Sequence, residues 1–227
     1  MSEGSAGSPA PRPASAVATG RGDDGTTGLL FGGDRIPKDD LRTEAYGTID
    51  EAVAALGLAR AELDQKGRIG VLPAALGEIE DLVLQIQREL FVVGAELAAN
   101  PSAWDRLKDG ETRVSVAMVA GIDGALADYE ARITFPAEFV VPGETRTSAA
   151  LELARTILRR AERRAVTLER AGLVPGAQLL PYLNRLADLL WVLARAAEQA
   201  ESRMATAARP TRAARRARTE QAPRTKG

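Results

Sequence analysis

An arginine-rich stretch, ELARTILRRAERRAVTLER at residues 152–170, carries the side chains best suited to chemistry in this sequence. Its composition is helical, and on a helix Arg155, Arg159 and Glu162 form a stripe at the edge of the apolar seam. Guanidinium groups at such an edge usually recruit an acid. The two guanidinium groups therefore face either solvent or an anion, and the anion is either a carboxylate of the same chain, with Asp50 as the candidate, or a ligand.

The remaining arginines of this stretch point more widely around the helix, and we expect them to be solvated: Arg160, Arg163, Arg164 and Arg170.

A second segment, TGRGDDGTTGLLFGGDR at residues 19–35, is rich in glycine, threonine and aspartate. Glycine lets successive backbone N–H groups converge on an oxyanion, hydroxyl groups donate to it, and carboxylates hold a magnesium ion. The Gly-Lys-Ser/Thr order of a P-loop is absent, so the segment outlines a phosphate site without matching that motif. Together with the arginine stripe it suggests a nucleotide polyphosphate as ligand.

The composition excludes several kinds of chemistry. With no Cys and no His, the chain has no disulfide, no cysteine nucleophile and no histidine general base. A hydrophobic fraction of 45% with only 4% aromatic residues favours long packed helices. No apolar run approaches the roughly 20 residues of a membrane span, and no export signal is apparent, so a cytoplasmic protein is expected.

The apolar residues recur at alternating intervals of three and four, which predicts helices at about 39–65 and 112–133 and on three further seams. Those seams are Ile79–Leu97, Leu151–Leu168 and Leu179–Leu193. A seam that repeats every 3.5 residues keeps facing its partner in a left-handed bundle. The prediction is therefore an all-α, five-helix bundle.

The two ends differ from the middle in composition. Residues 1–18, rich in Ser, Ala, Pro and Gly, are expected to be disordered, and the bundle domain is expected to span 19–200. Residues 201–227 hold eight Lys or Arg against two Glu, a net charge of +6, and predict a flexible basic tail. No aromatic residue is interleaved in this tail to stack on bases, which argues against a nucleic-acid contact.

In order and spacing, several motifs resemble those of the PduO-type ATP:cob(I)alamin adenosyltransferases over roughly residues 19–198. They are Thr19-x-x-Gly22-Asp23-x-Gly25-x-Thr27, KDDLRTEAYGTIDE (38–51), IQRELFVVGAELA (86–98), FVVPG (139–143), ARTILRRAER (154–163) and YLNRLADLLWVLAR (182–195).

The resemblance implies a homotrimer of five-helix bundles with active sites at the subunit interfaces. There, Co(I) of a reduced corrinoid would attack the 5′ carbon of ATP and expel triphosphate, with Mg²⁺ bound to the nucleotide. A Co(II) reductase and an adenosylcobalamin-dependent enzyme would be its partners.

The resemblance also implies roles for individual residues. Arg159 would contact the triphosphate, and Arg155 would pair with Asp50 across the subunit interface. Phe139 would cover the lower corrin face, although the residue pattern alone predicts an ordinary core position for it. The nucleotide would be bound by the N-terminal loop and the last helices, through Thr19, Gly22, Asp23, Gly25, Thr27, Lys38, Glu162 and Asn184.

The sequence departs from the family pattern at a few positions. Gly20 stands where a basic residue is usual in the ATP loop, with Arg21 as the adjacent substitute. Glu144 replaces a glycine and Glu152 a histidine, which adds negative charge near the cofactor-facing loop and helix. The other departures are Ala54 for asparagine and Ala187 for serine.

Three hypotheses follow, in decreasing order of preference. The first is a corrinoid adenosyltransferase. The second is a weakly active or non-catalytic paralogue that binds cobalamin or nucleotide as a carrier or sensor. The third is a structural bundle whose basic tail engages nucleic acid.

Overall fold

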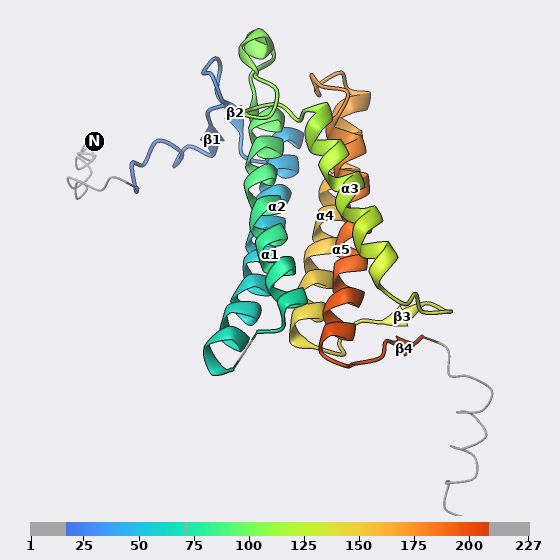
Figure 1. The fold of residues 1–227 in the computed structure, drawn as a ribbon. Coiled ribbons are helices and arrows are strands. Elements are labelled where there is room, and N and C mark those ends of the chain that lie inside the picture. The colour runs from blue at the N-terminus through green and yellow to red at the C-terminus, as the bar shows by residue number, and fades with distance from the viewer. Residues whose placement is uncertain (1–16, 71, 209–227) are drawn as a thin grey trace, which may run out of the picture.

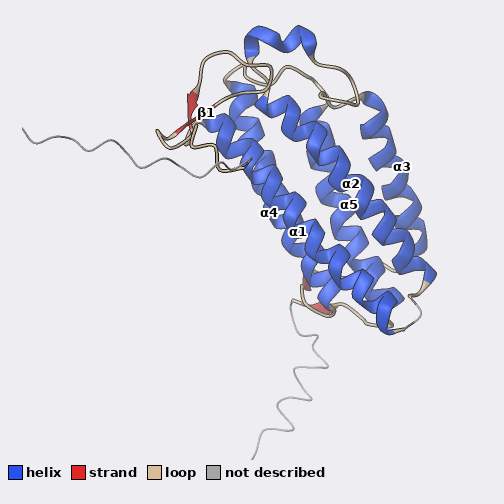
Figure 2. Cartoon of the chain, turned by 90° about the vertical axis from the view of Figure 1, so that its left-hand side faces the viewer, coloured by secondary structure: helices blue, strands red, loops and turns tan. Residues whose placement is uncertain are grey.

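The computed structural model describes residues 17–70 and 72–208, and its main elements are long α-helices lying side by side (Figures 1 and 2). They are α1 (Leu41–Ile69), α2 (Ala74–Ala98), α3 (Val116–Arg132), α4 (Arg146–Arg170) and α5 (Leu179–Ala200), with a short 3₁₀ helix η1 (Pro101–Arg106) between α2 and α3. Helix α1 packs along α2 and α4, and α5 packs along α3 and α4. The predicted all-α, five-helix bundle is confirmed.

Local sequence signals set the helix ends. The side chain of Asp40 caps α1 by accepting a hydrogen bond from the backbone N–H of Arg42 at 2.8 Å. Thr145 and Ser148 form a reciprocal capping box that starts α4. After α4, Gly172 adopts a φ of 68°, a left-handed conformation that glycine adopts without strain.

The core follows the predicted seams. Every seam position on α2, α4 and α5 is buried, from Ile79 to Leu97, from Leu151 to Leu168 and from Leu179 to Leu193. On α1, Ile49 and Leu56 are buried, whereas Val53 is only partly buried against the core. Burial of apolar surface stabilises the bundle by about 25 cal/mol per Å².

Two arginines of α4 expected to be solvated instead tie α4 to α1. Arg160 forms an ion pair with Glu51, and Arg164 forms one with Glu44 at 2.6 Å. The prediction was wrong for these two because a neighbouring helix places carboxylates within their reach, which the sequence of α4 alone does not reveal.

Two small antiparallel strand pairs lie at opposite ends of the bundle (Figure 1). At one end, β1 (Thr26–Thr27) pairs with β2 (Ile36–Pro37). At the other, β3 (Val140–Val141) pairs with β4 (Thr206–Ala207). The chain after α5 therefore pairs with the segment before α4 as far as residue 208, where the sequence predicts a flexible tail.

The rest of the predicted tails, residues 1–16 and 209–227, lies outside the described residues. Among the helices that are described, none is both long and apolar enough to cross a membrane.

Candidate active site

A cavity of about 910 Å³ lies between α4, α5 and the segment that contains β3. Its lining brings together three residues that the sequence singles out, Phe139, Arg155 and Arg159. Helix α5 contributes Ala187, Asp188 and Trp191, and α4 also contributes Glu152. The volume falls within the range of small-molecule sites.

The two arginines of the cavity differ in their surroundings. Arg155 is partly buried, and its Nε donates a hydrogen bond to Glu152 Oε2 at 2.7 Å. Arg159 is exposed, and its guanidinium has no ion pair within the described part of the chain. Arg159 is thus a positive charge at the cavity that an anionic ligand could neutralise.

The single chain does not pair Arg155 with Asp50. Asp50 is exposed on α1, and the carboxylate that Arg155 contacts is Glu152, one turn earlier on its own helix. The intramolecular form of the Arg155–Asp50 pair is therefore absent from the described residues, and the form between subunits stays a prediction.

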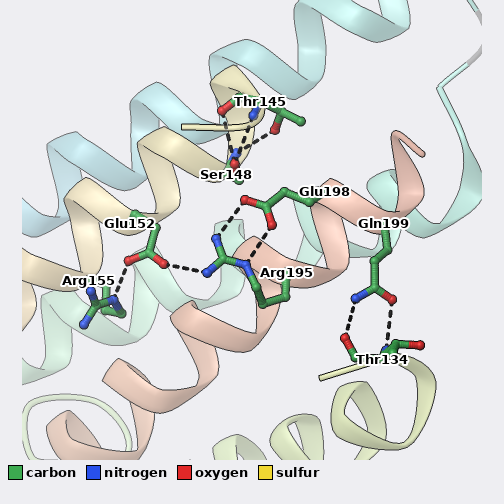
Figure 3. A network of polar contacts seen from close by, with 8 residues as sticks. All are labelled: Thr134, Thr145, Ser148, Glu152, Arg155, Arg195, Glu198 and Gln199. Carbon is green, nitrogen blue, oxygen red and sulfur yellow. Dashed lines mark hydrogen bonds and ion pairs between the residues drawn. The ribbon is translucent and has the colours of Figure 1, made fainter. Parts of the chain in front are cut away.

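A buried ionic network lies behind Arg155 (Figure 3). Glu152 Oε1 accepts a hydrogen bond from Arg195 Nη1 at 3.1 Å, and Arg195 also donates two bonds of 2.8 Å to Glu198. Sequence reasoning missed Arg195 and Glu198. An available signal was an arginine in the apolar run LLWVLARAAE with an acid three residues later.

Phe139 is 90% exposed, so the core position predicted from the residue pattern is wrong. Its carbonyl oxygen accepts a hydrogen bond of 2.6 Å from the backbone N–H of Ala208. The pairing of β3 with β4 holds the backbone beside Phe139 while the ring stands at the cavity. An exposed ring on a fixed backbone is suited to contact a flat apolar ligand.

Glu162 and Asn184, both predicted to belong to the nucleotide site, lie in contact with each other. The amide nitrogen of Asn184 on α5 donates a hydrogen bond to Glu162 Oε1 on α4 at 3.2 Å. Neither residue lines the cavity that contains Phe139.

The N-terminal loop is shaped by glycine and by contacts within itself. Gly25 has a φ of 79°, and its carbonyl accepts a bond from the Lys38 N–H at 2.9 Å. A Cβ atom at Gly22 would lie 2.9 Å from Lys38 Nζ, so the end of the lysine side chain lies directly against this glycine.

Other hydrogen bonds stiffen the same loop. Asp24 Oδ1 accepts from the backbone and the hydroxyl of Thr26, and these bonds lower the pKa of the Asp24 carboxyl. Arg35 donates to Thr26 and to the carbonyl oxygen of Arg21. Thr27 lies in β1, paired with Ile36 of β2.

The N-terminal loop and the cavity are separate in the single chain. No residue of the loop lines the cavity, and β1 lies at the opposite end of the bundle from β3 (Figure 1). The structure thus unites Phe139, Arg155 and Arg159 but does not bring Thr19, Gly22, Asp23 or Lys38 to them. Within residues 17–70 and 72–208, no group of three or more acidic, His or Cys side chains could hold a metal ion.

Comparison with known proteins assigns the family. The cobalamin adenosyltransferase family model matches residues 17–197. A corrinoid adenosyltransferase from Citrobacter freundii is 37% identical over 182 residues, which cover 80% of this chain and 94% of that protein. A cobalamin adenosyltransferase from Cupriavidus metallidurans is 39% identical over 82% of this chain and 90% of its own length.

Solved structures agree with this assignment. A variant PduO-type ATP:corrinoid adenosyltransferase from Lactobacillus reuteri, complexed with cobalamin and ATP, matches with a TM-score of 0.72 and 27% identity, over 85% of this chain and 96% of that one. A second variant from that organism, complexed with ATP, also has a TM-score of 0.72. By both sequence and fold, this chain belongs to the cobalamin adenosyltransferase family.

Proposed function

We propose that this chain transfers the 5′-deoxyadenosyl group of ATP to the Co(I) centre of a reduced corrinoid, which yields adenosylcobalamin and triphosphate. One observation carries the proposal: in a member of this family, an exposed aromatic ring, Phe139, shares a cavity with two arginines, Arg155 and Arg159. The similar structures contain ATP, or cobalamin and ATP.

The chemistry demands positioning and charge neutralisation more than proton transfer. The electron pair of Co(I) forms the Co–C bond as the bond between C5′ and its oxygen breaks, and the triphosphate leaves with the electrons of that bond. No proton has to be removed, so a chain without His lacks nothing that this reaction requires. What the protein supplies is alignment of the two substrates and stabilisation of the departing negative charge.

Arg159 is the residue proposed to stabilise the triphosphate. Its guanidinium is exposed at the cavity and makes no ion pair with the described carboxylates, so it can form charge-assisted hydrogen bonds with phosphate oxygens. Glu162 and Asn184, already joined by a hydrogen bond, are proposed to contact the nucleotide.

Phe139 is proposed to lie against the lower face of the corrin ring and exclude an axial base. A cobalt centre without its lower ligand is reduced to Co(I) more easily, and an apolar ring can exclude that ligand without chemistry of its own. The 90% exposure of Phe139 supports this role, because so large an exposed apolar side chain contributes little to the core.

A site completed by a second subunit would explain why the N-terminal loop and the cavity are apart in one chain. We propose that Thr19, Gly22, Asp23, Gly25, Thr27 and Lys38 bind ATP against the α4–α5 surface of a neighbouring subunit in a homotrimer. The same contact would let Asp50 reach Arg155, whose terminal guanidinium nitrogens have no hydrogen-bond partner among the described residues.

Magnesium would arrive with the nucleotide. Mg²⁺ bound to ATP takes ligands from phosphate oxygens and water and needs only one or two carboxylates, and this loop offers Asp23 and Asp24. A reductase that supplies Co(I) and an enzyme that consumes adenosylcobalamin are the partners that this reaction requires.

An anaerobic assay tests the proposal. Purified protein with ATP, Mg²⁺ and chemically reduced cobalamin is expected to form adenosylcobalamin and triphosphate, followed by absorbance and by chromatography. Binding of cobalamin without product would refute the proposal and support a carrier or sensor instead. Salt-sensitive binding of nucleic acid, lost on deletion of residues 201–227 and without any bundle ligand, would support the structural hypothesis.

A further inference from the structure

The carboxylate of Glu152 is shared between two arginines that lie on different helices (Figure 3). Oε2 accepts from Arg155 Nε at 2.7 Å, and Oε1 accepts from Arg195 Nη1 at 3.1 Å. Glu152 is itself buried on α4. Because both of its oxygens are engaged, its side chain has little freedom to move relative to α5.

Arg195 fixes Glu152 from behind. Its guanidinium and the carboxylate of Glu198 are each 1% exposed and are joined by two parallel hydrogen bonds of 2.8 Å. A bidentate pair of this kind is directional and strong when desolvated. The indole ring of Trp191 lies beneath the same guanidinium, at 5.4 Å from its carbon to the ring centroid. Glu198 and Trp191 thus fix the position of Arg195, and Arg195 in turn fixes the carboxylate of Glu152.

At the cavity, Glu152 engages only one edge of Arg155. The bond uses Nε, and the two terminal nitrogens of that guanidinium have no partner within residues 17–70 and 72–208. A planar guanidinium that is hydrogen-bonded at Nε presents its terminal N–H groups in a fixed direction. Because Arg155 lines the cavity, its bond to Glu152 determines where the positive charge of Arg155 lies in the cavity.

We infer that Glu152 is a positioning residue for adenosyl transfer, which acts through Arg155 and is backed by Arg195 and Glu198. The inference rests on the proposed function, because it assigns Glu152 a role in that reaction. The network contains two arginines and two glutamates, so its formal charges cancel and Arg155 keeps its place without an unpaired buried charge. Contact with Arg155, and not with substrate, is the route by which Glu152 acts.

A double-mutant cycle separates this role from a merely structural one. The variants are Glu152→Gln, Arg155→Ala and the double variant, in the full chain. Glu152→Gln keeps the side-chain shape but removes the negative charge, which weakens the hydrogen bond with Arg155 Nε. It is expected to lower kcat/KM for the reduced corrinoid by about 10- to 100-fold, the scale of an angstrom-sized misplacement, with KM for ATP changed less than about 2-fold. In the Arg155→Ala background, the same substitution is expected to cost less than about 2-fold.

The matched control is Glu62→Gln, which removes the carboxylate that pairs with Arg146. Arg146 lies on α4, as Arg155 does, but it does not line the cavity. Glu62→Gln is expected to keep kcat/KM, and thermal unfolding of all variants reports any loss of folding. Equal losses from Glu152→Gln with and without Arg155, or an equal loss in the control, would overturn the inference.

Crystal structures of the wild type and Glu152→Gln complete the test. Arg155 is expected to keep its side-chain position in the first and to lose it in the second. If the wild type makes no adenosylcobalamin, the proposed function fails, and these two structures alone decide whether Glu152 orients Arg155. An unmoved Arg155 in Glu152→Gln would refute the inference whether or not the protein turns over.

Discussion

The backbone N–H of Ala208 donates a hydrogen bond of 2.6 Å to the carbonyl oxygen of Phe139, so the C-terminal segment is attached directly to the residue proposed to face the corrin. Strand β4 continues this contact by pairing Ala207 with Val140. The segment after α5 thus contributes to the backbone that supports the cavity.

Truncation after Arg203 is expected to impair the reaction by removing β4. The α5 C-terminus remains intact, because the Arg203 N–H that bonds to Glu198 is retained. With Phe139 released from its partner strand, kcat/KM for the corrinoid is expected to fall about 10-fold, and KM for ATP is expected to stay unchanged. Steady-state kinetics measures both. Truncation after Ala208 is the control; if it is as damaging as the shorter chain, β4 is not the cause.

Arg159→Ala is expected to lower kcat by about 10²–10³-fold, the usual cost of removing one donor from a developing negative charge. Arg159 is exposed and unpaired in the described chain, so thermal stability is expected to change little. Single-turnover kinetics with saturating ATP measures the effect. Arg170→Ala, at the far end of α4, is the matched control. A normal rate in Arg159→Ala would refute the proposed triphosphate contact.

Arg21→Ala is expected to raise KM for ATP by about 10-fold, as the loss of one charged hydrogen bond would predict. Steady-state kinetics measures KM for ATP in Arg21→Ala, and an unchanged KM would contradict the prediction.

Gly20, where the family usually has a basic residue, has a φ of 71°, which a lysine adopts only with strain. Gly20→Lys is therefore expected not to improve ATP binding. Isothermal titration with a non-hydrolysable ATP analogue measures binding by Gly20→Lys, and tighter binding by that variant would contradict the expected strain.

Glu96 is expected to make stability depend on pH. Burial raises the pKa of this carboxyl above its ordinary value of 4.5, although the backbone N–H of Val114 donates to it. The folded state therefore binds the proton more tightly than the unfolded state. The stabilisation of the folded state by proton binding to Glu96 is complete below pH 4.5 and is lost as pH rises through the pKa of Glu96 in the folded protein.

Urea unfolding of the wild type and of Glu96→Gln between pH 4 and 8 measures this linkage. The stability of the wild type relative to the variant is expected to fall as pH rises across that window. A difference that is constant with pH would show that Glu96 titrates alike in both states.

The sequence determined the helices and their buried faces. Apolar spacing depends only on residues a few positions apart, so the seams of α2, α4 and α5 and the breaks at Pro73 and Pro101 could be predicted from local pattern. The same helical spacing of apolar residues predicted that Arg155 and Arg159 lie at the edge of the apolar seam of α4. Only the order of several motifs, through their resemblance to a family, suggested adenosyl transfer.

Tertiary structure decided which charges meet. Arg160 and Arg164 reach α1, and Arg155 reaches Glu152, because side-chain pairing depends on the distance between packed helices and on rotamer choice. Neither quantity is encoded in spacing along a single helix.

The exposure of Phe139 and the attachment of residues 201–208 were likewise settled by packing between segments far apart in the chain. The pairing of β3 with β4 holds the backbone next to Phe139 at the cavity, and the ring of Phe139 is exposed there. A pairing of two-residue strands leaves almost no periodic signal in the sequence, so only the folded chain reveals it.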